Sequence, residues 1–412
     1  MDTPDPVALT HILLGYLSRA DAPPPPTLAA WDALADEAEA QEVDAAMYVV
    51  ATRRGEVLPH HLEQRLALAA ALNGVRNARR RVELRAILEA FGAAGVDAIV
   101  LKGMHLAHLV YPDPSMRLMS DIDILVREAS LARAADVMRA LGYRQDREET
   151  LERTLAAAHH LPAFRREEAS PVEIHWTISR PPSPFDVDLA GLWERSRAAM
   201  IGDVPARVLC DADLIQHLCL HLAYNHAWVH REPRAAPRRA LLDLVVSLDR
   251  LAPEIDWKQS IERANRLGTG RFVYCALAVV GRMAERPLDD VLAGLARETG
   301  DDAIVEAACA LVSGRETGVM HESLARVAAM PRTSRARGAL GALFPSRESM
   351  RRRYGLAGAA DVTPWHYLRR LAGFVAGGRW LAAFTVRGRG DVEQLRRRTT
   401  IKSWKRRTLG RS

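Results

Sequence analysis

The chain has 412 residues, 48% of them apolar, so it is longer than one average domain and can bury two or three substantial cores. Its formal net charge is only +6, its four cysteines lie far apart without a Cys-x-x-Cys pair, and its N-terminus lacks the pattern of a signal peptide. We therefore expect neither a disulfide framework nor a cysteine zinc site. No uninterrupted apolar run is long enough for a membrane span, and we predict a soluble cytoplasmic protein.

Residues 1–85 are predicted to form a helical N-terminal segment. The pattern indicates helices at 11–17 and 31–52, separated by a proline run at 23–26 that cannot continue a helix. A longer helix is predicted at 61–91, and we expect it to pack on the sheet described next. Its apolar residues at helical spacing are Leu66, Ala70, Val75, Val82 and Leu84.

The segment 86–195 is predicted to be an α/β core. An apolar run at 96–101 indicates a strand that ends in a tight turn. An amphipathic helix at 131–141 ends at Gly142, and the chain then returns to a strand near Tyr143.

Two aspartates separated by one isoleucine lie in an apolar run of this core. At strand spacing, Asp121 and Asp123 point to the same face. Neighbouring carboxylates raise each other's pKa unless a cation offsets their charge. We expect Mg²⁺ or Mn²⁺, because Mg²⁺ prefers hard oxygen ligands and is commonly held by one or two carboxylates plus substrate phosphates.

A third carboxylate follows in the alternating run at 171–178, which is typical of a strand. Glu173 and His175 lie on one face of that strand, and its apolar residues lie on the other. Two-metal phosphoryl chemistry usually requires a third carboxylate. Glu173 is therefore the candidate third ligand, and His175 is a candidate for contact with a lid or acceptor.

These motifs resemble the polymerase-beta-like nucleotidyltransferase superfamily, and more narrowly its bacterial branch of nucleotidyltransferase family proteins. The residues that carry the resemblance are the Leu-Lys-Gly turn at 101–103, Tyr-Pro-Asp-Pro at 111–114, Arg117, Asp121-Ile-Asp123 and Val-Glu-Ile-His-Trp at 172–176. The resemblance implies a small mixed sheet with flanking helices and two catalytic metal ions. It also implies transfer of a nucleoside monophosphate from a nucleoside triphosphate.

One feature departs from the superfamily, which usually has Gly-Ser or Gly-Gly in the first turn. Lys102 and Gly103 stand there instead. A hydroxyl that would contact phosphate is therefore missing, so that either Lys102 contributes charge in its place or turnover is reduced.

In the mechanism that we expect, Asp121 and Asp123 bind both metal ions. Glu173 completes one site and deprotonates or orients the acceptor hydroxyl. Four further residues are expected to bind the nucleotide: Gly103 by letting the backbone approach the triphosphate, Lys102 and Arg117 by neutralising phosphate oxygens, and Ser120 by hydrogen bonding. The simpler alternative for Arg117 is a surface ion pair with Asp113 or Asp121.

An Asp-x-Asp pair alone is weak evidence for this chemistry. It also occurs in sugar-nucleotide glycosyltransferases, in aspartyl-phosphate hydrolases and on solvated strand ends. The Lys-Gly turn upstream and the Glu-x-His strand downstream favour the nucleotidyltransferase interpretation.

The segment 196–330 is predicted to be a helical lobe, with helices at 211–226, 238–251, 257–267, 272–285 and 301–312. His217 and His221 share a helix face, and Asp243 lies on the next helix. This group can bind metal or phosphate, or brace two helices. The resemblance makes it a candidate lid over nucleotide or acceptor.

The final segment, 331–412, is basic. From Arg379 onward it holds eleven Lys or Arg against two acidic residues. Trp404 among these cations indicates a polyanion partner such as nucleic acid, an acidic peptide or anionic lipid; the alternative is a solvated end.

The sequence therefore predicts an α/β (α+β) fold, with a small mixed-sheet nucleotidyltransferase core in a mainly helical protein. The predicted activity is metal-dependent transfer of a nucleoside monophosphate from a triphosphate to an acceptor hydroxyl or phosphate, with release of pyrophosphate. The alternative is a non-catalytic nucleotide-sensing or nucleic-acid-binding protein on the same fold. The sequence leaves the acceptor open.

Overall fold

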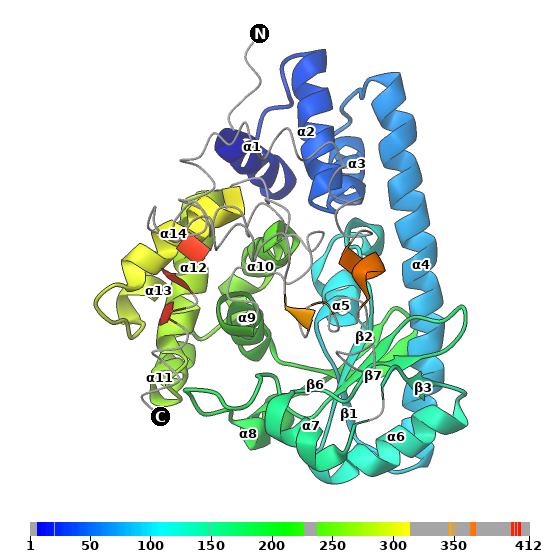
Figure 1. Ribbon diagram of the computed structural model, residues 1–412. Helices are drawn as coiled ribbons and strands as arrows, with labels where there is room; N and C mark the ends of the chain where they lie inside the picture. The colour runs from blue at the N-terminus through cyan, green and yellow to red at the C-terminus, as the bar shows by residue number, and fades with distance from the viewer. Residues whose placement is uncertain are drawn as a thin grey trace. The chain divides into compact units, whose positions relative to one another are not determined.

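The computed structural model describes residues 6–19, 21–147, 149–225 and 237–313 (Figure 1). Beyond 313 it describes the short pieces 346–347, 350, 363–367, 397–398, 400–401 and 403–404. By its contacts the chain divides into two units, one being Met1–Ser313 with Ile401–Ser412 and the other Gly314–Thr400. All that follows concerns the first unit.

A seven-stranded mixed sheet lies at the centre of the described chain, with the strand order β3-β4-β5-β2-β1-β7-β6. The strands are β1 (Ala98–Val100), β2 (Ile122–Val126), β3 (Arg144–Gln145), β4 (Phe164–Arg165), β5 (Val172–His175), β6 (Arg197–Ile201) and β7 (Val204–Val208). The pairs β2–β5 and β1–β7 are parallel, and the others are antiparallel. Every residue of β2 is buried, as expected of a central strand covered on both faces.

Helices make up most of the remainder, which confirms the predicted fold class. They are α1 (Pro6–Ser18), α2 (Leu28–Ala40), α3 (Asp44–Arg53), α4 (His60–Ala93), α5 (Lys102–His105), α6 (Leu131–Ala140), α7 (Leu151–Ala157), α8 (Leu189–Arg195), α9 (Asp211–Leu220), α10 (Pro237–Leu251), α11 (Trp257–Arg266), α12 (Gly270–Ala284), α13 (Asp289–Gly294) and α14 (Asp301–Ser313). No helix in the described ranges is both long and apolar enough to cross a membrane. The domain boundaries near 85, 195 and 330 remain predictions.

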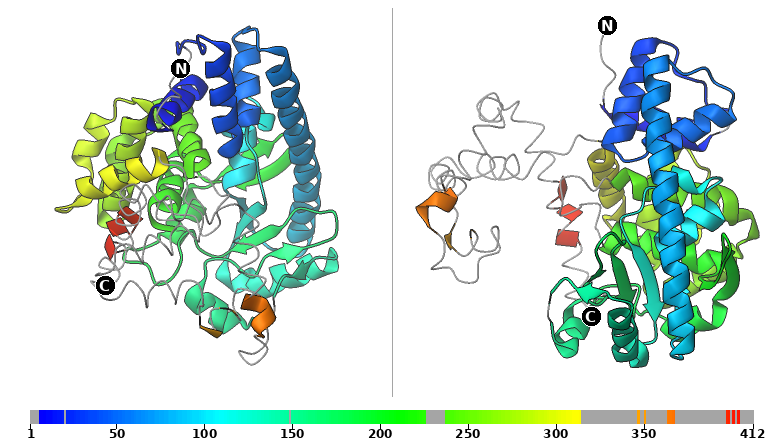
Figure 2. Two further views of the ribbon diagram at one scale, coloured as in Figure 1. Left: turned by 45° about the horizontal axis from the view of Figure 1, so that its top comes forward. Right: turned by 90° about the vertical axis from the view of Figure 1, so that its right-hand side faces the viewer.

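Two hydrophobic cores organise these elements. One surrounds the sheet and takes Leu84, Ile87 and Phe91 from α4. The other lies among the helices before and after the sheet. Figure 2 shows α4 running alongside both the N-terminal helices and the sheet, so that this helix joins the two parts of the unit.

The buried face of α4 differs from the predicted one. Val75 and Val82 are 61% and 66% exposed, whereas Asn73 and Asn77 are buried. The Asn77 amide donates to the carbonyls of Pro114 and Arg117 at 2.7 and 2.9 Å. Polar side chains are needed here because the facing loop presents buried carbonyls that require donors.

Two further predictions need correction. The single helix expected at 31–52 is wrong: α2 and α3 are separate helices, with Glu42 in the left-handed region at φ 58° between them. The hairpin of β6 and β7 was not predicted at all. Its two-residue turn has Gly202 at φ 62°, a conformation that hairpin turns of this length require.

Candidate active site

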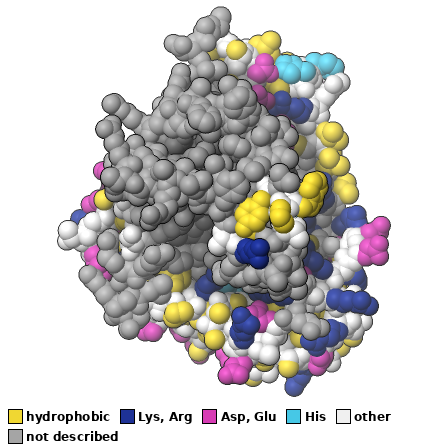
Figure 3. Space-filling view, in the orientation of Figure 1, with side chains coloured by type: hydrophobic (Ala, Val, Ile, Leu, Met, Phe, Trp, Pro, Cys, Tyr) yellow, Lys and Arg dark blue, Asp and Glu magenta, His cyan; other side chains and the backbone are white. Residues whose placement is uncertain are grey.

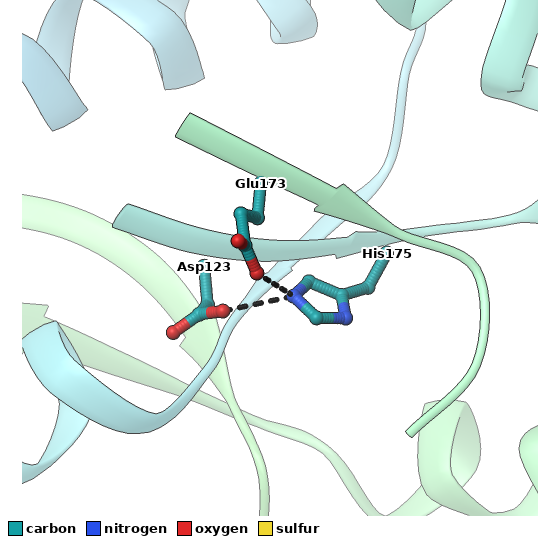
Figure 4. Close-up of side chains that lie close together, drawn as sticks. All are labelled: Asp123, Glu173 and His175. Atoms are coloured by element: carbon teal, nitrogen blue, oxygen red, sulfur yellow. Dashed lines mark hydrogen bonds and ion pairs between the residues drawn. The ribbon is translucent and has the colours of Figure 1, made fainter. Parts of the chain in front are cut away.

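Two parallel strands place the acidic residues. The register pairs Asp123 on β2 directly with Glu173 on β5, and Leu125 with His175. Asp121 comes immediately before β2. The sheet is thus the reason that carboxylates far apart in the sequence lie close together, as Figure 4 shows for Asp123 and Glu173.

Asp123 is the centre of a buried polar cluster. Its Oδ1 accepts hydrogen bonds from His175 Nε2 at 2.8 Å and from Lys102 Nζ at 3.0 Å (Figure 4 shows the histidine contact). Glu173 Oε2 lies 3.5 Å from the same His175 nitrogen. The two basic groups therefore fix the orientation of Asp123, and His175 also contacts Glu173.

The carboxylates carry an excess of negative charge. Burial, followed by the charges of Asp123 and Glu173, raises the pKa of Asp121 to about 6. Burial also opposes ionisation of Asp123, but Lys102 and His175 outweigh it and hold the pKa of Asp123 well below its usual range. A divalent cation would relieve the remaining repulsion.

The donor set fits such a cation. Asp121, Asp123 and Glu173 supply hard carboxylate oxygens, which suit Mg²⁺ and Mn²⁺. Asp123, Glu173 and His175 each present a ligand atom, and these atoms lie within 4.8 Å of one another. Ser120 donates to Asp121 Oδ2 at 3.0 Å and so orients that carboxylate.

The first residues of α5, Lys102 and Gly103, pack closely against the loop before β2. Lys102 has φ 32°, a conformation uncommon for a residue with a side chain. A Cβ on Gly103 would lie 2.9 Å from Met119 Sδ and 3.2 Å from Arg117 Nη1. Glycine is therefore required at 103 by close approach of the loop.

Arg117 pairs with Asp243 on α10, rather than with Asp113 or Asp121. Its Nε and Nη2 donate to the two Asp243 oxygens at 2.8 and 2.9 Å, and Tyr111 donates to Oδ1 at 2.8 Å. Both partners of the ion pair are at most 10% exposed. The pair ties the loop beside Gly103 to the helical lobe.

Removing one partner of this pair is expected to destabilise the fold strongly. Asp243→Asn leaves the Arg117 guanidinium buried without its counter-charge, which costs about 3–5 kcal/mol. Replacing both residues, as in Arg117→Met with Asp243→Leu, is expected to recover much of that loss. Urea unfolding of the two variants measures the difference, and equal losses in both would contradict the argument.

The predicted lid residues are only partly brought together. His217 and His221 lie on successive turns at the end of α9, with ring centroids 6.5 Å apart. Burial, followed by the charges of Lys102 and His175, lowers the pKa of His217 to about 3, so its ring is neutral. Asp243 is held by Arg117 and Tyr111.

Sequence reasoning missed His159 and His160. Leu161 N donates to Ile174 O at 2.9 Å, so this segment runs antiparallel beside β5. The ring centroids of His159 and His160 lie 5.3 and 5.2 Å from that of His175. The only sequence signal was the histidine doublet, and nothing in the sequence linked it to the Glu-x-His strand.

The basic end of the chain lies mostly outside the described residues. Trp404 is described and is 4% exposed. Its Nε1 donates to Asp301 Oδ1 at 2.9 Å, and the Arg271 guanidinium lies 5.2 Å from its ring centroid. Trp404 is therefore packed on α12 and α14.

A mixed sheet that carries clustered carboxylates on parallel neighbouring strands, flanked by helices, is the arrangement expected of a nucleotidyltransferase. The model of the uncharacterised nucleotidyltransferase family matches residues 27–285, more than half of the chain, and the chain belongs to that family. This confirms the predicted resemblance to nucleotidyltransferase family proteins and the predicted class of enzyme, a transferase of nucleotidyl groups.

Two further comparisons add little. No curated protein matches the chain. Among solved structures, the solution structure of the antibiotic-resistance factor ANT(2'')-Ia matches 47% of this chain and 95% of its own, at 12% identity and a TM-score of 0.32. A likeness this slight supports no inference about the site.

Proposed function

We propose that the protein transfers a nucleoside monophosphate from a metal-bound nucleoside triphosphate to an acceptor hydroxyl or phosphate and releases pyrophosphate. The observation that carries the proposal is the parallel register that sets Asp123 beside Glu173, with Asp121 two residues before Asp123. A cytoplasmic location, as the sequence predicts, would supply the triphosphate.

The acidic residues take the roles predicted for them. Asp121, Asp123 and Glu173 would hold Mg²⁺ or Mn²⁺, which when bound neutralises phosphate oxygens and lowers the pKa of a coordinated nucleophile. Glu173 orients the acceptor hydroxyl and takes its proton. The acceptor oxygen then bonds to the α-phosphorus as the bond to pyrophosphate breaks.

The turn at Gly103 receives the triphosphate in this proposal. Gly103 lets the loop that carries Arg117 approach this turn closely, and Lys102 adds positive charge beside Asp123. Arg117 uses Nε and Nη2 for Asp243, and its Nη1 lies beside Gly103, where it meets a phosphate oxygen. Ser120, which donates to Asp121 Oδ2 in the absence of nucleotide, would donate to a phosphate oxygen instead once the nucleotide binds. His217 and His221 contribute to a lid over nucleotide or acceptor.

Calorimetric titration with a non-hydrolysable triphosphate analogue tests the proposal. We expect binding with Mg²⁺ or Mn²⁺ and little or none in the presence of a chelator. Equal affinity with and without metal would overturn it.

A nucleic-acid-binding role is the second candidate, and the basic end of the chain favours it. On the described surface visible in Figure 3, Lys and Arg lie interspersed with acidic side chains. The eleven Lys or Arg from Arg379 onward are the positive charge that a polyanion would meet in this role.

Neutralising the tail separates binding from folding. Because Trp404 is packed, substitution is preferable to truncation, and the cations Lys405, Arg406 and Arg407 are changed to Gln. If the tail binds RNA, the triple variant is expected to lose affinity, most strongly at low salt, because counterion release drives such contacts. Nucleotide transfer to a small uncharged acceptor should be retained. RNA affinity equal to that of the wild type at all salt concentrations would eliminate the polyanion partner.

A further inference from the structure

The imidazoles of His160 and His175 lie close to the carboxylates of Asp123 and Glu173. His175 Nε2 lies 2.8 Å from Asp123 Oδ1 and 3.5 Å from Glu173 Oε2. His160 Nε2 lies 3.7 Å from the same Glu173 oxygen. His160 and His175 are paired across an antiparallel bridge, so their side chains share a face of the sheet with Glu173.

The hydrogen bond of His160 determines which of its nitrogens faces the site. Its Nδ1 lies 2.7 Å from the carbonyl oxygen of Leu161, which can only accept, so Nδ1 carries the proton and donates. In the neutral ring, Nε2 is then a lone pair that faces the Glu173 carboxylate. Two electron-rich atoms face each other, and a cation between them would stabilise the arrangement.

The spacing of these atoms matches a coordination shell. Metal–ligand bonds of about 2.0–2.2 Å place neighbouring ligand atoms about 3.0–3.5 Å apart. Three separations between the imidazole nitrogens and the carboxylate oxygens are 2.8, 3.5 and 3.7 Å, and the ligand atoms of Asp123, Glu173 and His175 all lie within 4.8 Å of one another. The Nδ1 donation of His160 to a backbone carbonyl is also the contact that usually orients a metal-binding histidine.

The mixture of donors indicates the kind of ion. Imidazole nitrogen suits first-row transition metals, whereas Mg²⁺ prefers oxygen ligands and near-ideal octahedral geometry. Glu173 faces the lone pair of His160, and an ion bound here takes the place of the proton that His175 Nε2 donates to Asp123. An ion with nitrogen ligands therefore fits between the imidazoles of His160 and His175 and the carboxylate of Glu173.

We infer that Asp123, Glu173, His160 and His175 form a transition-metal site, which binds Mn²⁺ in preference to Mg²⁺ before nucleotide arrives. The metal ion that arrives with the nucleotide is then held by Asp121 and Asp123. The inference adds to the proposed function, and the catalytic role of this first, nitrogen-ligated ion rests on that function.

Pulsed electron paramagnetic resonance of the full, metal-free chain titrated with Mn²⁺ alone tests the site. We expect one bound Mn²⁺ per chain with ¹⁴N modulation from imidazole, and at least about a tenfold excess of Mg²⁺ over Mn²⁺ for its displacement. His160→Gln should weaken Mn²⁺ binding about tenfold or more and reduce the nitrogen modulation.

His159→Gln is the matched control, because the His159 ring lies against His160 and His175 but has no described contact with the carboxylates. It should keep both Mn²⁺ affinity and modulation. A Mn²⁺ spectrum without nitrogen modulation, no Mn²⁺ binding without nucleotide, or equal losses in the two variants would each overturn the site. The wild-type spectrum decides even if His160→Gln misfolds.

The same samples separate this inference from the proposed function. A nitrogen-ligated Mn²⁺ in a protein that never transfers nucleotide would support the metal site and remove the proposed activity. Magnesium-dependent transfer with a nitrogen-free Mn²⁺ spectrum would do the reverse.

Discussion

Asp123→Asn and Asp121→Asn are each expected to reduce nucleotidyl transfer by at least about a thousandfold. Each substitution removes a charged ligand from the cation, and the charge stabilisation that a bound cation supplies is worth several kcal/mol, or about a factor of ten for each 1.4 kcal/mol. Calorimetry with triphosphate and Mg²⁺, together with a pyrophosphate-release assay, measures the loss. Triphosphate affinity equal to that of the wild type in both variants would contradict the assignment.

The thermal stability of Asp121→Asn is the control for its loss of activity. Its folded-state pKa is raised to about 6 from the ordinary 3.8, so the folded chain holds that proton more tightly than the unfolded chain does. The ionised carboxylate therefore opposes folding above about pH 6, and this penalty disappears as the pH falls below the ordinary value. Without metal at pH 7 to 8, Asp121→Asn should unfold at a temperature equal to or higher than the wild type, so lost activity cannot be attributed to misfolding.

The effect of Mg²⁺ on the unfolding temperature also distinguishes the wild type from Asp121→Asn. The cation binds the folded wild type and should raise its unfolding temperature, whereas Asp121→Asn should respond less. A wild-type chain that is insensitive to Mg²⁺ and Mn²⁺ alike would contradict the metal site.

The parts of the site that could be predicted from the sequence are those set by strand alternation. Spacing alone put Asp121 with Asp123 and Glu173 with His175 on single strand faces. The parallel pairing of β2 with β5 then brought the two motifs together, and no local pattern states such a pairing. The requirement of two-metal chemistry for a third carboxylate supplied that step.

Other features could not be predicted, because long-range packing decides them. The sequence assigned Arg117 to phosphate oxygens or, alternatively, to a surface ion pair with Asp113 or Asp121, whereas α10 brings Asp243 to it across the unit. On α4 the apolar Val75 faces solvent and Asn77 faces the core, because the loop opposite offers carbonyls. Local hydrophobicity cannot reveal a buried polar partner that comes from another element.

Glu173 and His175 share a strand face, and substitutions at the two positions should have clearly different effects. Glu173→Gln is expected to reduce transfer by about a thousandfold or more, because it removes a ligand charge and the group that takes the acceptor proton. His175→Gln should reduce it by about ten- to a hundredfold, because it removes a neutral metal ligand but no ligand charge, and Lys102 still donates to Asp123 Oδ1 and keeps that carboxylate oriented.

Steady-state assays at saturating triphosphate and Mn²⁺, with circular dichroism as a check of folding, compare the two variants. His175 is only 1% exposed and lies beneath the carboxylates, so it reaches the acceptor through Asp123 and Glu173 rather than directly. A larger loss in His175→Gln than in Glu173→Gln would mean that Glu173 is not the third ligand. In that case the imidazole of His175 would be the group that takes the acceptor proton, and the carboxylate of Glu173 would serve to orient it.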